Sequence, residues 1–205
     1  MSDASVQAKY PNAKWFDSNY SGTESGTFDQ PYSNIATAIS NTTGTDPNND
    51  AVVGIKSGSH TVTRITYSKT MRFVGVDTSA VINTSGSGYG GAIMSSATTG
   101  SLSLYLETFT LTHNNTAATY GAIRIPGDGG ATNTTCVAEG CRFLVFDARI
   151  ADTSQWRGWF MCHDSTPYAE NSLLVTDCEF YTGNQNTTYG LTLGGSNNED
   201  GFGTV

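Results

Sequence analysis

The chain has 205 residues and a formal net charge of -8, and a surface of that sign repels phosphate backbones, so we expect no nucleic-acid partner. Only 37% of the residues are hydrophobic and 14% are charged, and the abundant Ser, Thr and Asn compete with the helix backbone for hydrogen bonds, which disfavours a helical bundle. The length fits one domain, and the sequence holds no long apolar run that would insert into a membrane.

The first helical pattern along the chain is "PYSNIATAIS", which begins at Pro31. Ser33 is a favourable N-cap residue. The apolar residues of the segment, at spacings that place them on one helix face, are Ile35, Ala36, Ala38 and Ile39. We therefore expect a short amphipathic helix within residues 31–41.

Two β-rich runs follow, "AVVGIKSGSHTV" from Ala51 and "MRFVGVDTSAVI" from Met71. We align them on Gly54 and Gly75, which we take to occupy the same relative place. Polar turn residues follow each glycine, so the two runs are predicted to begin the first two units of a repeating β structure.

Three later segments repeat the same apolar pattern: "LYLETFTL" from Leu104, "CVAEGCRF" from Cys136 and "LLVTDCEF" from Leu173. Their starting residues are 32 and 37 residues apart. The matched columns are Leu104–Cys136–Leu173, Leu106–Ala138–Val175, Phe109–Cys141–Cys178 and Leu111–Phe143–Phe180. We predict that these side chains point inward as stacked ladders.

A second series of short strands, each preceded by glycine, accompanies these segments: "GGAIM" at Gly91, "YGAIRI" at Tyr120, "RGWFM" at Arg157 and "YGLTL" at Tyr189. No crossover helix fits between the strands. Such a repeat cannot bury its apolar face alone, but units stacked about 4.8 Å apart can. The pattern predicts an all-β solenoid whose exposed end is covered by the helix of residues 31–41.

The segments "WFDSNYSGTESGTFDQPYSNIATAI", "AVVGIKSGSHTV" and "MRFVGV" resemble the N-terminal part of the pectate-lyase-like superfamily, over residues 15–82. Residues 57–60 stand where a Pro-Gly-x-Tyr turn often occurs in that family. The resemblance implies a single-stranded right-handed parallel β-helix with a short N-terminal capping helix. Residues 1–41 would form the strand, loop and capping helix, and residues 42–205 the coils of the same domain. That fold hosts lyases, hydrolases, adhesins and phage tailspikes, so it does not identify a function.

The four cysteines, Cys136, Cys141, Cys162 and Cys178, lack the close spacing of a zinc site. We expect buried thiols, with Cys141 and Cys178 as neighbours in one ladder. A reduced thiol pair is the expected state, and a disulfide is the alternative. No metal or cofactor is expected.

An enzyme of this kind would need either two carboxylates, or a carboxylate and a basic side chain, close together in one site. Glu107 and Glu139 share a column, and a pair of carboxylates is the catalytic unit of a glycosidase. Arg149 and Asp152 supply the residue types of a lyase, which would use an Arg or Lys as base. The alternative is that these charges are solvated turn residues. The superfamily's hydrolase motifs, Asn-Thr-Asp, Asp-Asp, Gly-His-Gly and Arg-Ile-Lys, are absent.

The aromatic segment "QWRGWFMCHD" allows two interpretations. Trp156, Arg157 and Trp159 are residue types that bind sugar rings by stacking and hydrogen bonding. Strand alternation would instead bury one Trp in the core and expose the other.

Two functions from different classes follow. The first is a non-catalytic virion or surface protein, such as a tailspike-like, fibre or capsid-decorating component, assembled in the host cytoplasm without a secretory signal. Its partners would be copies in a homotrimer or other virion proteins, with cell-surface polysaccharide as a further ligand. The alternative is an extracellular polysaccharide lyase or glycoside hydrolase acting as a phage depolymerase.

The segment "YGLTLGGSNNEDGFGTV" begins a further unit without a second apolar helix to cover it. Unpaired strand edges and exposed apolar ladders favour association. We therefore expect residues 189–205 to pack against a partner. The expected contact residues are Leu191, Leu193, Phe202 and Val205. Polar turns that fold over the end within one chain are the alternative.

Overall fold

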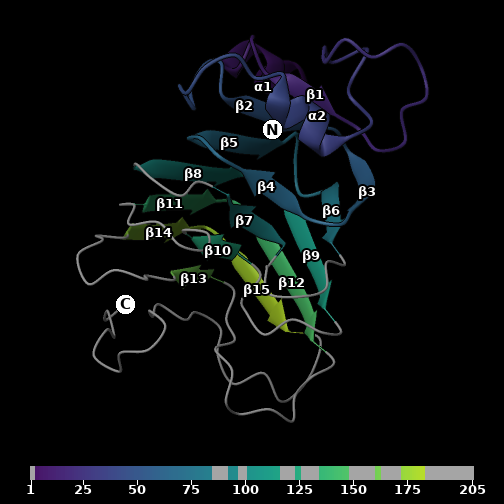
Figure 1. Ribbon diagram of the computed structural model, residues 1–205. Coiled ribbons are helices and arrows are strands. Elements are labelled where there is room, and N and C mark those ends of the chain that lie inside the picture. The colour runs from purple at the N-terminus through teal and green to yellow at the C-terminus, as the bar shows by residue number, and fades with distance from the viewer. Residues whose placement is uncertain are drawn as a thin grey trace, which may run out of the picture.

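The computed structural model describes residues 3–84, 92–96, 101–115, 123–125, 134–147, 160–162 and 172–182. These residues form two short helices and three sheets in which every strand pair is parallel (Figure 1). The expected predominance of β structure is therefore confirmed. Among these residues, neither helix is long and apolar enough to cross a membrane.

The largest sheet has six strands in the order β1-β2-β5-β8-β11-β14. Its strands are β1 (Lys14–Phe16), β2 (Val52–Ile55), β5 (Met71–Gly75), β8 (Leu102–Glu107), β11 (Thr134–Glu139) and β14 (Ser172–Thr176). The five-stranded sheet consists of β3 (Gly58–Val62), β6 (Ala80–Thr84), β9 (Thr110–Asn115), β12 (Arg142–Asp147) and β15 (Glu179–Thr182). The four-stranded sheet consists of β4 (Ile65–Tyr67), β7 (Ile93–Ser95), β10 (Ile123–Ile125) and β13 (Phe160–Cys162).

From β2 onward the chain enters the six-, five- and four-stranded sheets in turn. Each strand consequently pairs with the strand that lies three places later in the chain, and Figure 1 shows the pairs stacked from the purple N-terminal end towards yellow β15. This pairing places equivalent positions of successive repeats beside one another.

The register confirms the predicted columns. Leu104 pairs with Cys136 and Cys136 with Leu173, and Leu111 pairs with Phe143 and Phe143 with Phe180. The second series is confirmed where it is described, since Ile123 in β10 pairs with Ile93 in β7 and with Phe160 in β13. Its fourth member, at Tyr189, lies outside the described residues.

The alignment of Gly54 with Gly75 is wrong by one residue, because Gly54 pairs with Val74 and Gly75 pairs with Ile55. The two glycines meet different needs. A Cβ at Gly54 would lie 2.7 Å from the Trp15 ring, whereas a Cβ at Gly75 would lie 2.4 Å from the carbonyl oxygen of Thr108. Each glycine admits a close neighbour, so their spacing carries no information about register.

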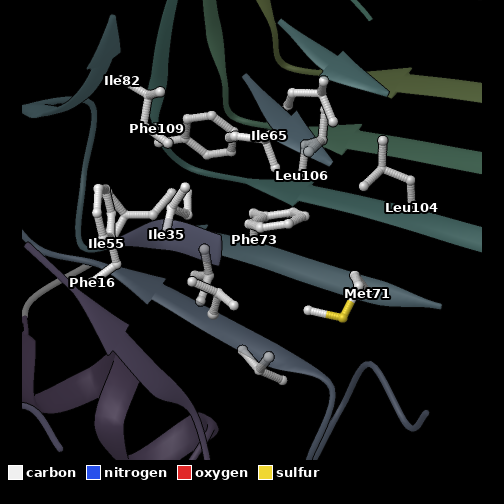
Figure 2. Packing of buried hydrophobic residues seen from close by; sticks show 14 of the residues in the cluster. Phe16, Ile35, Ile55, Ile65, Met71, Phe73, Ile82, Leu104, Leu106 and Phe109 are labelled. Atoms are coloured by element: carbon white, nitrogen blue, oxygen red, sulfur yellow. The ribbon is translucent and has the colours of Figure 1, made fainter. Parts of the chain in front are cut away.

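The core lies between the sheets, and all three contribute to it. Figure 2 shows Phe73 of β5, Ile82 of β6 and Ile65 of β4 directed into the same interior. All three side chains are fully buried. A strand inside such a stack has a parallel strand on each side, so its inward side chains are covered from both directions. Apolar residues therefore recur at matched positions of successive repeats.

Helix α2 (Ile35–Ser40) confirms the short amphipathic helix and packs on β1, β2 and β4. Its buried residues are Ile35, Ala38 and Ile39. The predicted cap is wrong, because the N-cap is Asn34, whose side chain accepts hydrogen bonds from the backbone N–H groups of Ala36 and Thr37. Ser33 instead hydrogen-bonds Glu24 through its backbone and its hydroxyl group.

Helix α1 (Asp3–Lys9) was not predicted from the sequence. It has one buried residue, Val6, so its apolar periodicity is too weak to be recognised. It lies with α2 at the end of the sheets next to β1 and β2 (Figure 1).

A turn with left-handed backbone connects the six- and five-stranded sheets in three successive repeats. Thr108, Gly140 and Asp177 have φ angles of 55°, 61° and 51°. Backbone hydrogen bonds stack these turns, from Thr108 N–H to the Glu139 carbonyl (2.9 Å) and from Gly140 N–H to the Thr176 carbonyl (3.0 Å). The turns thereby fix the position of the residue that follows each one, including Cys141 and Cys178.

Candidate functional site

The strongest concentration of charge among the described residues surrounds Glu107, the last residue of β8. Its side chain is 4% exposed. Lys9 Nζ lies 2.6 Å from its Oε1, and the Tyr10 hydroxyl and Arg72 Nη1 lie 2.6 and 2.7 Å from its Oε2. Both carboxylate oxygens are therefore occupied by partners from the protein. We call Lys9, Tyr10, Arg72 and Glu107 the Glu107 cluster.

Arg72 connects the Glu107 cluster to its surroundings. Its Nε donates to the Pro47 carbonyl oxygen at 2.7 Å and its Nη2 to Asn48 Oδ1 at 3.0 Å. Its guanidinium carbon lies 5.4 and 4.7 Å from the ring centroids of Tyr10 and Tyr105. The cluster thus joins α1, the loop before β2, and strands β5 and β8 by hydrogen bonds and cation–π contacts.

The environment keeps Glu107 ionised. Burial acts to raise the pKa of its carboxyl group, but hydrogen bonds from Lys9 and Tyr10 and the positive charges of Lys9 and Arg72 lower that pKa below its usual value. A general acid in a glycosidase needs the opposite, a raised pKa. Glu107 therefore fits a structural ion cluster and is unsuited to donate a proton.

Glu139 pairs in register with Glu107, which confirms that the two acids share a column. Glu139 is exposed, however, and Glu107 is buried. The carboxylate oxygens of Glu107 are directed to Lys9, Tyr10 and Arg72. A catalytic pair at these positions therefore stays a prediction.

A second group, which sequence reasoning missed, joins Asp17, Ser18 and His60. The backbone N–H and the hydroxyl group of Ser18 lie 3.2 and 3.3 Å from His60 Nδ1, and Asp17 Oδ1 lies 3.6 Å from the same atom. His60 Nε2 lies 2.8 Å from the Lys56 carbonyl oxygen, to which it can donate. A catalytic triad uses opposite ring nitrogens for its serine and its acid, so this group is a structural contact that holds the buried His60 beside the partly exposed Asp17 and Ser18.

The third candidate is a hollow of about 250 Å³ beside Cys141, which we call the Cys141 hollow. Its lining residues are Thr78, Gly140, Cys141, Arg142, Asp177 and Glu179. Arg142 Nε and Glu179 Oε2 form an ion pair of 2.8 Å at its edge. The hollow therefore brings a thiol, a charge pair and an acid to one place on the five-stranded sheet.

The other residues proposed from the sequence lie outside the described residues. They are Arg149, Asp152, Trp156, Arg157, Trp159, Leu191, Leu193, Phe202 and Val205. Among the described residues, no three or more His, Cys, Asp or Glu side chains are arranged to hold a metal ion.

Sequence reasoning also missed Lys9, Tyr10 and Arg72 as partners of Glu107. One signal was available: Arg72 is a charged residue within the otherwise apolar run "MRFVGV". A charge inside a buried strand requires a partner, but its identity depends on contacts between distant segments.

No protein family, curated protein or solved structure matches this chain. The predicted membership in the pectate-lyase-like superfamily is therefore wrong: what is established is a sheet-rich structure with parallel strands in three sheets and two helices. The residues that suggested the family have local roles instead. Trp15 and Phe16 pair with β2, and Asn34 caps α2.

Proposed function

We propose that this chain is a non-catalytic structural protein of a virion, built as a right-handed parallel β-solenoid with α2 as its N-terminal cap. One coil of the solenoid would be a passage through the six-, five- and four-stranded sheets. The fixed order in which the chain enters the sheets supports this, as does the pairing of each strand with the one three places later. A fibre, spike or capsid-decorating component would use such a stack as a rigid support.

One observation carries the proposal: burial falls along a single column. Ile82, Leu111 and Phe143 are fully buried, whereas Phe180, the next residue in the column, is 37% exposed. On the six-stranded sheet, Leu174 of β14 is 59% exposed. Apolar surface at the last described strands is what an assembly partner would cover. We propose that the partner is a second and third copy in a homotrimer, or another virion protein.

The Glu107 cluster supports the non-catalytic part of the proposal. Its acid is ionised and fully occupied by Lys9, Tyr10 and Arg72. A role in joining α1 to the sheet accounts for every polar contact of the carboxylate. Binding of cell-surface polysaccharide through Trp156, Arg157 and Trp159 is a further part of the proposal.

Sedimentation velocity of the purified full chain tests assembly, with the double variant Leu174→Ser/Phe180→Ser and the control Glu139→Gln. We expect a trimer, or attachment to particles recovered from the lysate, that the double variant loses and the control keeps. A stable monomer that attaches to no particle would contradict the proposal.

A second measurement tests the absence of catalysis. The full chain is incubated with acidic and neutral capsular polysaccharides, and the products are followed by size-exclusion chromatography and by the absorbance of unsaturated uronate. We expect no shortening. Shortened chains that disappear in the Arg149→Ala or Asp152→Ala variant would establish a depolymerase instead, present in the virion or outside the cell.

A further inference from the structure

Two cysteines from successive repeats lie side by side next to the Cys141 hollow. Cys141 immediately precedes β12 and Cys178 immediately precedes β15, and the next residues, Arg142 and Glu179, pair in register. The backbone N–H of Glu179 donates to the Cys141 carbonyl oxygen at 2.9 Å. Neighbouring strands are about 4.8 Å apart, and disulfides join Cα atoms that are roughly 4.4 to 6.8 Å apart. The backbone spacing of the two cysteines is thus one that a disulfide can bridge.

The two thiols differ in exposure. Cys141 is fully buried and Cys178 is partly buried against the core. The Cys141 thiol donates to the Glu139 carbonyl oxygen at 3.5 Å, and the Cys178 thiol donates to the Thr176 carbonyl oxygen at 3.3 Å. Asp177, which lines the hollow, directly precedes Cys178. Cys141 itself lines the hollow but has no exposed surface. The partly exposed Cys178 is therefore the thiol that a small molecule reaches first.

Their acidities also differ. A hydrogen bond from the Cys141 thiol lowers the pKa of Cys178 to about 7. Burial, together with that same contact, raises the pKa of Cys141 well above its usual value. Near neutral pH a large fraction of Cys178 is consequently thiolate, whereas Cys141 stays protonated. When Cys178 loses the proton that it donates to Thr176, the Cys141 proton turns from the Glu139 carbonyl oxygen to the Cys178 sulfur. Nucleophilic cysteines are recognised by this combination of partial exposure and lowered pKa.

We propose that Cys178 and Cys141 form a dithiol site that low-molecular-weight disulfides oxidise to a disulfide between the turns preceding β12 and β15. First, the Cys178 thiolate attacks one sulfur of the small disulfide, whose S–S bond breaks and releases one small thiolate. Next, Cys141 gives its proton to solvent and its sulfur attacks Cys178 Sγ, which releases the second small thiolate. Two protein thiols are oxidised, and one small disulfide is reduced to two thiols.

The bond would join two successive repeats near the end of the described sheets. It would close a loop from Cys141 to Cys178 and so restrict the unfolded chain. A protein assembled in a reducing cytoplasm and released into an oxidising exterior would gain this bond after release. Only that last biological setting rests on the function proposed above, because the exchange chemistry depends on the two thiols alone.

The test treats the native full chain with oxidised glutathione and follows the mass of the protein, with peptide mapping of the modified cysteines. For the wild type we expect a brief glutathione adduct on Cys178 and then a product lighter than the reduced chain by two hydrogens, with Cys141 linked to Cys178. The Cys141→Ser variant should stop at the adduct. The Cys136→Ser variant, which changes a buried thiol of another column, should behave as the wild type.

Two results would overturn the proposal. One is a wild type that, like Cys141→Ser, keeps the glutathione adduct. The other is a wild type whose Cys178 does not react at all. The wild type also supplies a test that does not depend on the folding of the serine variants. Its rate of adduct formation should rise with pH to a half-maximum near the Cys178 pKa of about 7, and a rate that rises only around the ordinary thiol pKa of about 8.5 would contradict the assignment of the nucleophile.

Discussion

The two ends of the described sheets are built from the same strand pattern, but their inward apolar residues are buried to different extents. At the N-terminal end, α1 and α2 lie beside β1 and β2, and the inward residues Phe16 and Ile55 are fully buried. At β15, Phe180 occupies an inward position and is 37% exposed. A matched apolar column therefore guarantees the direction of a side chain but not its burial.

The difference in burial along the column that contains Phe143 and Phe180 is tested most strongly by truncating each of these two rings in turn. Phe143→Ala should destabilise the protein by about 3 to 5 kcal/mol, because it leaves a cavity between Leu111 and Phe180. Phe180→Ala should cost about half as much at protein concentrations that keep the chain monomeric, since part of that ring is exposed in the single chain. Urea unfolding of both variants measures the difference. Equal losses would show that the two positions are equally buried in solution.

A change of intermediate size addresses the attachment of α1. Glu107→Gln should cost about 2 to 3 kcal/mol, below the range for removing one partner of a fully buried ion pair, because Lys9 is 51% exposed. Glu139→Gln, at the paired but exposed position, should cost no more than about 0.5 kcal/mol. Amide exchange in residues 3–9 should rise in the first variant alone. If exchange there stays slow, α1 is held by Val6 and not by the cluster.

The same cluster predicts how stability depends on pH. In the folded protein, the pKa of the Glu107 carboxyl group lies below its usual value of 4.5. A lowered carboxyl pKa contributes stability that is fully present above the unfolded pKa and is lost as pH falls through the folded one. Below about pH 4.5, unfolding free energy should therefore fall more steeply in the wild type than in Glu107→Gln. Parallel curves would mean that the carboxylate is not stabilised by its partners.

The smallest expected effect concerns the cover at the N-terminal end. Asn34→Ala removes the side chain that caps α2 and should cost about 1 kcal/mol. Ser33→Ala removes a hydroxyl group that contacts exposed Glu24 and should cost less than about 0.5 kcal/mol. Thermal unfolding of the pair separates the two residues, and the reverse order would return the capping role to Ser33.

The sequence predicts the repeating part of the fold well, because columns such as Leu104, Cys136 and Leu173 contact one another and share one environment. It predicts single glycines poorly. Gly54 leaves room for the Trp15 ring and Gly75 leaves room for the Thr108 backbone, so the two glycines are needed for unrelated reasons. Helix α1 has too little apolar pattern to be found.

The candidate site was less accessible to sequence reasoning than the fold. The shared column of Glu107 and Glu139 could be deduced, since it follows from the repeat. The partners of Glu107 could not, because Tyr10 is 97 residues away and Lys9 is 98 residues away. Contacts of this kind decide whether a carboxylate is catalytic or structural, and they cannot be read from a single sequence.

The pairing of each strand with the one three places later ties folding to the order of synthesis. A growing chain emerges N-terminus first, so β2 is available as an edge before β5 is made, and β5 before β8. Each new strand can add to an existing template. Lys9 and Tyr10 are the exception, because their partner Glu107 ends β8 and is made long after them. The contact that fastens the first helix is therefore completed late, when the six-stranded sheet has already reached its fourth strand.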